Sequence, residues 1–284
     1  MVKSVILAIL TGGASDAGTL EAALAAARLR PAHVKALHVQ GDPLAALTYG
    51  GPEALYVREE LLAAAERETA ERAQRVRRSF ERWSADHELP IAEVPQANAA
   101  VTASLVVEGG DALARHGRLA DLVVIANPTG ADDGGAAIDF EAALFETGRP
   151  VLLVPHAAAS IPFEKVLIAW KSSAEASRAV ASALPILQAA KEVAVFAATE
   201  REAAPTSADD LIGYLGWHGV AARGCRFDGG APSVGHALLR EADRMGARLL
   251  VMGGYSHSRL RQFILGGVTR HVVENATLPI LIAH

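Results

Sequence analysis

Short apolar runs alternate along the chain with longer amphipathic segments. This pattern predicts parallel β-strands with helices on both faces of the sheet, because strands that are buried on both faces are apolar throughout. The helices fill the intervals between the runs, so we predict an α/β fold. The predicted strands lie at 3–10, 33–39, 90–95, 121–126 and 150–155 in the first half of the chain, and at 165–170, 192–198, 221–227, 248–253 and 279–283 in the second.

The apolar runs of the second half repeat those of the first half in character and in order. Three pairs of segments carry the similarity, namely 3–8 with 164–169, 120–126 with 247–253, and 149–154 with 278–283. Three matches in the same order indicate an internal duplication. We therefore predict two tandem domains, 1–158 and 162–284, each built on a five-stranded, parallel, doubly wound sheet.

Two helices can be placed from their side-chain pattern. The segment at about 56–86 has an apolar stripe with spacings of three and four residues, which predicts a long helix that packs on the core. A partner-binding face is the alternative for this stripe, which consists of Thr69, Ala73, Val76, Phe80 and Trp83. The run Ser172-Ser173-Ala174-Glu175 predicts a capping box at the start of the helix that follows strand 165–170.

Composition excludes several classes of protein. The chain is 51% hydrophobic but 5% aromatic, and its net charge of -5 leaves no basic field for a nucleic acid. No apolar run reaches the roughly 18 residues of a membrane-spanning helix, so we expect no membrane partner. The single cysteine, Cys225, allows no intrachain disulfide and fits a small buried hydrophobe. These features predict a cytoplasmic protein.

The glycine-rich segment after the run 248–253 is the strongest candidate for chemistry. Ligands of open parallel sheets bind beyond the carboxyl ends of the strands, where helix N-termini offer unpaired N–H groups. The pair Gly266-Gly267 stands inside an otherwise helical stretch, where each glycine costs about 1 kcal/mol relative to alanine. The approach of a phosphate to exposed N–H groups would explain these glycines.

This segment resembles the G-x-x-G, nine residues, G-[S/T] motif of nucleotide-binding members of the universal stress protein family. Gly253 aligns with the first glycine and Gly266 with the third, whereas Ser256 and Gly267 replace the second glycine and the Ser or Thr. Lys171 stands where the family usually has an acidic residue. The strand order extends the resemblance over nearly the whole chain, in the family's tandem form, and implies its Rossmann-like, nucleotide alpha-hydrolase-like fold.

The resemblance implies a stress-response or regulatory factor whose second half binds ATP, with magnesium, or a related adenine nucleotide. The adenine would lie near Ala169 and Val195, the phosphates near Gly253, Ser256, Gly266, Gly267 and Val268, and the groups that offset their charge would be Lys171, His257 and Arg259. We assign no catalytic residue, and any activity would be at most a weak ATPase. The corresponding first-half segment, 126–135, carries acidic residues, so we expect that half to bind no nucleotide.

Two other functions stay open. The departures at Ser256, Gly267 and Lys171 are equally compatible with a ligand-free interaction scaffold that keeps a vestigial pocket. The loop Thr11–Asp16 resembles the S-G-G-x-D-S loop of adenylating ATP pyrophosphatases, but its last two residues are in the reverse order. A strand-to-helix turn with Asp16 near the helix cap is the simpler interpretation of this loop.

The remaining expectations concern metals and assembly. The ten histidines show no pair at i,i+4 spacing on one helix with a carboxylate between them, so we expect no metal site. The apolar strands 150–155 and 279–283 would be exposed edges, which favour aggregation unless they are paired. We therefore predict that they pair with each other across a pseudo-twofold axis, as an intramolecular pseudo-dimer. Association of two chains into a homodimer is an expectation from analogy.

Overall fold

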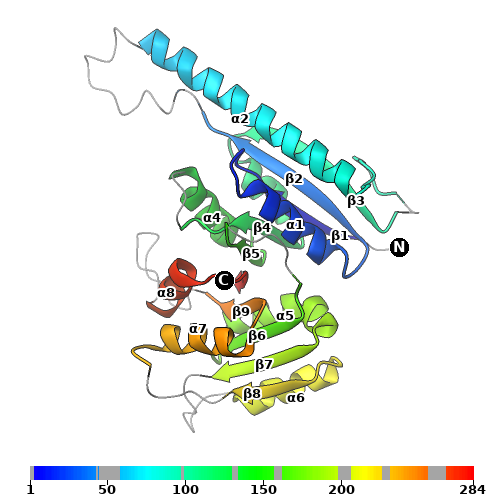
Figure 1. Ribbon diagram of the computed structural model, residues 1–284, viewed down its shortest axis with the longest axis vertical. Coiled ribbons are helices and arrows are strands. Elements are labelled where there is room, and N and C mark those ends of the chain that lie inside the picture. The colour runs from blue at the N-terminus through cyan, green and yellow to red at the C-terminus, as the bar shows by residue number, and fades with distance from the viewer. Residues whose placement is uncertain are drawn as a thin grey trace.

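The computed structural model describes residues 3–42, 44, 58–96, 99–129, 134–156, 162–197, 206–225, 231–254 and 267–284. Over these ranges the chain forms an α/β fold of ten strands and eight helices (Figure 1). The strands are β1 (Ser4–Ile9), β2 (Ala32–Gln40), β3 (Val101–Gly109), β4 (Leu122–Ala126), β5 (Val151–Val154), β6 (Lys165–Trp170), β7 (Glu192–Ala197), β8 (Ala222–Cys225), β9 (Leu249–Gly253) and β10 (Ile280–Ala283).

All these strands belong to one sheet, in the order β3-β2-β1-β4-β5-β10-β9-β6-β7-β8. Within each half the neighbouring strands are parallel, and the order of the first five mirrors that of the last five. The halves join where β5 and β10 pair antiparallel, with Leu153 opposite Ile280 and Val151 opposite Ile282. The prediction that these two strands pair across a pseudo-twofold axis is confirmed. The domain limits at 158 and 162 stay a prediction, because 157–161 lie outside the described residues.

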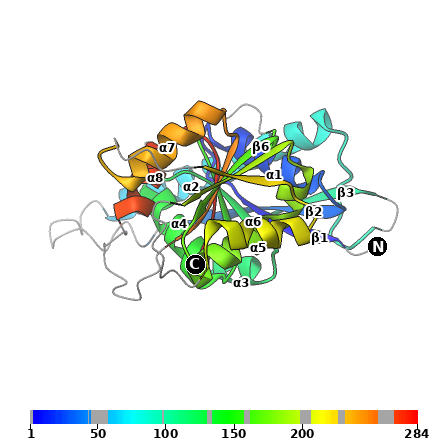
Figure 2. The ribbon, with the colours of Figure 1, turned by 90° about the horizontal axis from the view of Figure 1, so that it is seen from below.

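The helices cover both faces of the sheet. They are α1 (Asp16–Ala27), α2 (Arg58–Asp86), α3 (Ala112–Arg118), α4 (Gly134–Glu146), α5 (Ala174–Ala189), α6 (Ala208–Trp217), α7 (Val234–Met245) and α8 (Gly267–Asn275). Buried side chains of α1, α2, α5 and α6 form one core cluster with the sheet, and those of α3, α4, α7 and α8 form a second. Seen from below, the strands fan out in a strong twist between the helices (Figure 2).

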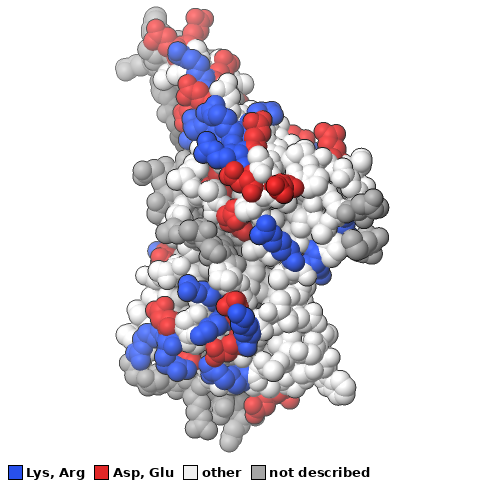
Figure 3. Space-filling model, turned by 45° about the vertical axis from the view of Figure 1, so that its right-hand side comes forward, with Lys and Arg blue, Asp and Glu red and all other residues white. Residues whose placement is uncertain are grey.

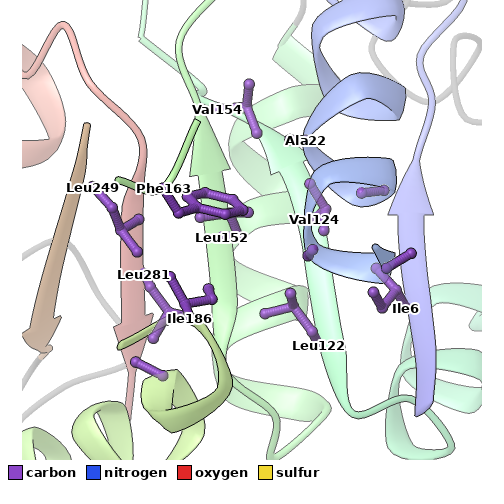
Figure 4. Close-up of a cluster of buried hydrophobic side chains, with 14 of the residues drawn as sticks. Ile6, Ala22, Leu122, Val124, Leu152, Val154, Phe163, Ile186, Leu249 and Leu281 are labelled. Carbon is purple, nitrogen blue, oxygen red and sulfur yellow. The ribbon is translucent and has the colours of Figure 1, made fainter. Parts of the chain in front are cut away.

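The core is continuous across the junction of the halves. Phe163, just before β6, is buried beside Leu152 of β5, and Leu281 of β10 lies in the same cluster (Figure 4). Because side chains of both halves fill this space, separating β5 from β10 would expose apolar surface of both. The two halves therefore form one structural unit.

Most predicted elements are confirmed, but the third strand of the first half was predicted in the wrong place. Instead of 90–95, the strand is β3 at 101–109, which pairs with β2 along its whole length. Ile91 forms only an isolated bridge to Ala103. Prolines at 90 and 95 limit that segment, because a proline cannot donate to a strand ladder.

The long amphipathic helix is confirmed as α2, the longest described helix, which lies along the first half of the sheet (Figure 1). Four members of its predicted apolar stripe are buried in the core, namely Ala73, Val76, Phe80 and Trp83. On its exposed side Arg72 forms an ion pair with Glu68 at 3.0 Å. None of the described helices combines the length and the apolarity that crossing a membrane requires.

Candidate functional site

The carboxyl ends of β7, β6 and β9 lie side by side, because these strands pair in parallel. Ala169 pairs with Phe196 of β7 on one side and with Met252 of β9 on the other. The strand ends that carry Ala169, Val195 and Gly253 are therefore adjacent, but the side chains of Val195 and Ala169 pack in the clusters on opposite faces of the sheet and do not line one site. The side chain of Val195 is fully buried in the core cluster beneath α5 and α6, and Ala169 is only partly buried.

Gly253, the last residue of β9, lies against the first turn of α5. A Cβ atom at this position would collide with the backbone N of Ala176 and would lie 2.8 Å from the carbonyl carbon of Glu175. Backbone atoms cannot move aside as a flexible side chain can, so only glycine allows this approach. This glycine brings the N-terminus of α5 close to the end of β9.

The start of α5 differs by one residue from the prediction. The N-cap is Ser173, whose hydroxyl accepts a hydrogen bond from the backbone N of Ala176 at 3.2 Å, so the predicted capping box beginning at Ser172 is wrong. The hydroxyl of Ser172 instead lies 2.7 Å from that of Thr206. The reason is local, because the extended backbone that suits an N-cap occurs at Ser173. Lys171 is exposed two residues before this cap.

The helix α8 begins at Gly267, the residue that the motif places against phosphate. A Cβ atom at Gly267 would meet nothing within 4 Å, and Val268 beside it is exposed. Farther along, Val272 and Val273 are buried in the core, and the ring of His271 stacks on that of His236 of α7 with centroids 4.0 Å apart. The predicted site residues Ser256, His257 and Gly266 lie outside the described residues, as does Arg259.

In the first half, the loop after β1 is closed by a buried carboxylate. Asp16, the first residue of α1, accepts hydrogen bonds from the backbone N of Thr11 at 2.8 Å and of Gly12 at 3.0 Å. Burial raises the pKa of Asp16, although these bonds oppose the shift. From α2, Arg75 donates to the carbonyl of Gly12 at 3.0 Å. The turn with Asp16 near the cap is confirmed, and two amides that an adenylating enzyme would offer to phosphate are already bonded.

The exit of β4 is also filled, by a residue that sequence reasoning did not single out. Asn127 occupies the place of Gly254, since the backbone N of Asn127 donates to Val154 and that of Gly254 donates to Ala283, each at 2.8 Å. The side chain of Asn127 is buried and donates to the carbonyl of Val273 in α8 at 2.8 Å. An Asn-Pro-Thr turn directly after a buried strand was the only signal in the sequence.

Among the described residues, neither a cluster of charged side chains nor the thiol of Cys225 forms a second candidate site. Basic and acidic side chains interleave on the face that Figure 3 shows, both along α2 and on the second half. No group of three or more His, Cys, Asp and Glu side chains in the described ranges could hold a metal ion. Cys225 is partly buried, and burial together with the carboxylate of Glu241 raises its pKa to about 11. The thiol is therefore protonated near neutral pH and a weak nucleophile.

Comparisons with known proteins agree with this architecture. Residues 225–284 match the model of the universal stress protein family. A universal stress protein from Archaeoglobus fulgidus DSM 4304 has a similar structure, with a TM-score of 0.65 and 15% identity, over 100% of this chain and 99% of that one. A functionally unknown protein from Pseudomonas aeruginosa PAO1 follows with a TM-score of 0.56 and 14% identity, over 99% and 92% of the two chains.

A putative universal stress protein from Pseudomonas aeruginosa UCBPP-PA14 has a TM-score of 0.55 and 15% identity, over 99% of this chain and 93% of that one. No curated protein sequence matches the chain. The structural likeness is one of fold, and it extends over the whole chain. The resemblance to the universal stress protein family that the sequence indicated is thereby confirmed.

Proposed function

We propose that this chain is a stress-response or regulatory factor that binds one adenine nucleotide, ATP with magnesium, in its second half. Residues 225–284 match the universal stress protein family, and the chain has the fold of universal stress proteins over its full length. The cytoplasmic location and the association into a homodimer are part of this proposal and rest on composition and on family resemblance. No catalytic residue is assigned.

One observation carries the proposal, namely the contrast between equivalent strand exits in the two halves. In the first half, Asp16 and Asn127 occupy the space after β1 and β4 and bond to the backbone there. In the second half β9 ends at Gly253, Gly254 follows, and the strand places no side chain of its own at its exit; the backbone of α5 lies beside Gly253 and the side chain of Ile282 beside Gly254. A helix N-terminus beside such an exit is a favourable site for an anion, because its N–H groups and its dipole both attract negative charge.

The start of α8 fits the phosphate end of the nucleotide. Gly267 has open space around its Cβ position, so a phosphate oxygen meets no side chain at this first helical residue. Lys171, an exposed residue directly after β6, brings positive charge to the same edge of the sheet. The adenine would lie toward Ala169, at the partly buried end of β6.

The ligand-free scaffold stays the second candidate function, because one observation favours it. The space beside Gly253 is taken by the backbone of α5, so this glycine is required by packing whether or not a nucleotide binds. The adenylating enzyme has no such support, because Asp16 already bonds the amides of Thr11 and Gly12.

Substitutions at Gly267 test the proposal in both directions. We expect Gly267→Asp to abolish ATP binding, because a carboxylate at the start of α8 repels phosphate. We expect Gly267→Ser to tighten ATP binding about fivefold, because it adds a hydroxyl donor in open space. The matched control is Gly134→Asp, at the first residue of α4, which should leave the affinity unchanged. Calorimetry with MgATP measures all three variants. A wild-type protein that gives neither heat nor a thermal shift at millimolar MgATP would leave only the scaffold.

Lys171 provides a second, independent test. We expect Lys171→Ala to weaken ATP binding by about 1–3 kcal/mol, the range for hydrogen bonds to charged groups. The control is Lys191→Ala, which removes an ion pair with Glu164 next to the opposite ends of β6 and β7. If the two variants bind ATP equally well, Lys171 does not contact the phosphates.

A further inference from the structure

Helix α8 is held at its C-terminal end by the first half of the chain. The side-chain nitrogen of Asn127 donates to the carbonyl of Val273 at 2.8 Å, across 146 positions of sequence. Val273 lies in the last turn of α8, where carbonyl groups have no partner within the helix. The first half thus supplies a capping donor to a helix of the second half.

Asn127 is fixed in this orientation by its own turn. Its side-chain oxygen accepts hydrogen bonds from the backbone N of Thr129 at 3.1 Å and from the hydroxyl of Thr129 at 2.9 Å. Asn127 is buried with 5% of the residue exposed, and its bond to Val273 is buried, whereas the two bonds to Thr129 are partly buried. A buried amide with both ends satisfied has one stable orientation, which aims the nitrogen at α8.

Among the described residues, the contact has no counterpart in the other direction. The pseudo-twofold axis that relates the halves places Gly254 where Asn127 stands, and glycine has no side chain with which to reach α4. The second half contributes a different link, in which the ring of His284 packs edge-on against Phe145 of α4 and lies 3.4 Å from the carbonyl of Gly254. The first half therefore contacts α8 directly through Asn127 and reaches Gly254, at the exit of β9, by way of His284.

We infer that Asn127 is a positioning residue, through which the first half holds α8 in the orientation that presents its N-terminus to a nucleotide phosphate. The first half then has a defined role, because its strand exit, which we expect to bind no nucleotide, orders the helix that we propose to bind the phosphates. The link to affinity rests on the proposed function, whereas the ordering of α8 does not.

Hydrogen exchange of the full chain without nucleotide tests the positioning role. We expect Asn127→Ala to speed the exchange of α8 amides about tenfold relative to those of α1 and β1, because the last turn loses its closer donor and keeps only the hydroxyl of Thr129, 3.4 Å from the Val273 carbonyl. The control is Thr147→Val, which removes a buried hydroxyl bond to Ala143 at the end of α4 and should leave α8 protected. Unchanged exchange in α8, or a uniform increase over the whole chain, would overturn the inference.

Calorimetry with MgATP then tests the link to the nucleotide. We expect Asn127→Ala to weaken the affinity about tenfold and Thr147→Val to leave it unchanged. Equal affinities of wild-type and Asn127→Ala proteins, with α8 loosened, would disprove the link. If wild-type protein binds no ATP, the proposed function fails, while the exchange of α8 still decides whether Asn127 orders this helix.

Discussion

Replacing Gly253 by alanine is expected to lower the free energy of unfolding by about 3 kcal/mol. The added Cβ atom would collide with the backbone N of Ala176 and would lie 2.8 Å and 2.9 Å from the carbonyl carbon of Glu175 and the Cα of Ala176. To make room, α5 must shift relative to β9, although its side chains Ala176, Ala179 and Val180 are packed in the core. Urea unfolding followed by circular dichroism measures the loss.

Gly213→Ala is the matched control, with the opposite sign. Gly213 is exposed within α6, and a Cβ atom there would meet nothing within 4 Å. Alanine should therefore stabilise the protein by about 0.5–1 kcal/mol through its higher helix propensity. If Gly253→Ala is as stable as the wild-type protein, α5 does not lie against β9 in the way described.

Asp139→Asn is expected to stabilise the protein in a pH-dependent manner. The carboxyl group of Asp139, a residue of α4, is largely buried, and this burial raises its pKa from 3.8 to about 6. A carboxyl group whose pKa is higher in the folded state binds protons on folding, so stability falls as the pH rises from about 4 to about 6 and stays lower above that. A shift of about two units corresponds to about 3 kcal/mol. Asparagine avoids this cost, so the variant gains up to about 3 kcal/mol at pH 7.5 and almost nothing at pH 4.

The control for this pH dependence is Asp210→Asn. Hydrogen bonds from the backbone and the hydroxyl of Ser207, within the capping box of α6, lower the pKa of Asp210. The ionised form of Asp210 therefore favours folding, and its replacement should reduce stability at pH 7.5 rather than increase it. Urea unfolding at both pH values checks the two variants together, and a pH-independent gain for Asp139→Asn would contradict the assigned burial.

The sequence predicted the strands well wherever a run of apolar residues is buried on both faces. Nine of the ten predicted strands match the observed ones closely, and the pairing of β5 with β10 followed from the need to cover two apolar edges. The exception is the segment 90–95. From the sequence, either 90–95, which has prolines at both ends, or 101–109, which mixes polar and apolar residues, could be the strand beside β2. The structure shows that 101–109 pairs with β2.

The candidate site was less predictable, because its side-chain contacts join positions far apart in the sequence. Nothing near Asn127 indicates that its partner is a backbone carbonyl at Val273. The requirement for glycine at 253 was anticipated, but as an approach to phosphate, whereas the neighbour in the structure is the backbone of α5. The cap at Ser173 rather than Ser172 depends on backbone angles that two adjacent serines do not distinguish.

The stoichiometry of the MgATP titration of the wild-type chain tests whether the second half binds nucleotide while the first half holds α8 in place. We expect one nucleotide for each chain, since Asp16 and Asn127 fill the strand exits of the first half, whereas two glycines stand at the end of β9 in the second half and Gly267 has open space at the start of α8. Two nucleotides for each chain would contradict the closure of the first half. No binding at millimolar MgATP would contradict the nucleotide site itself.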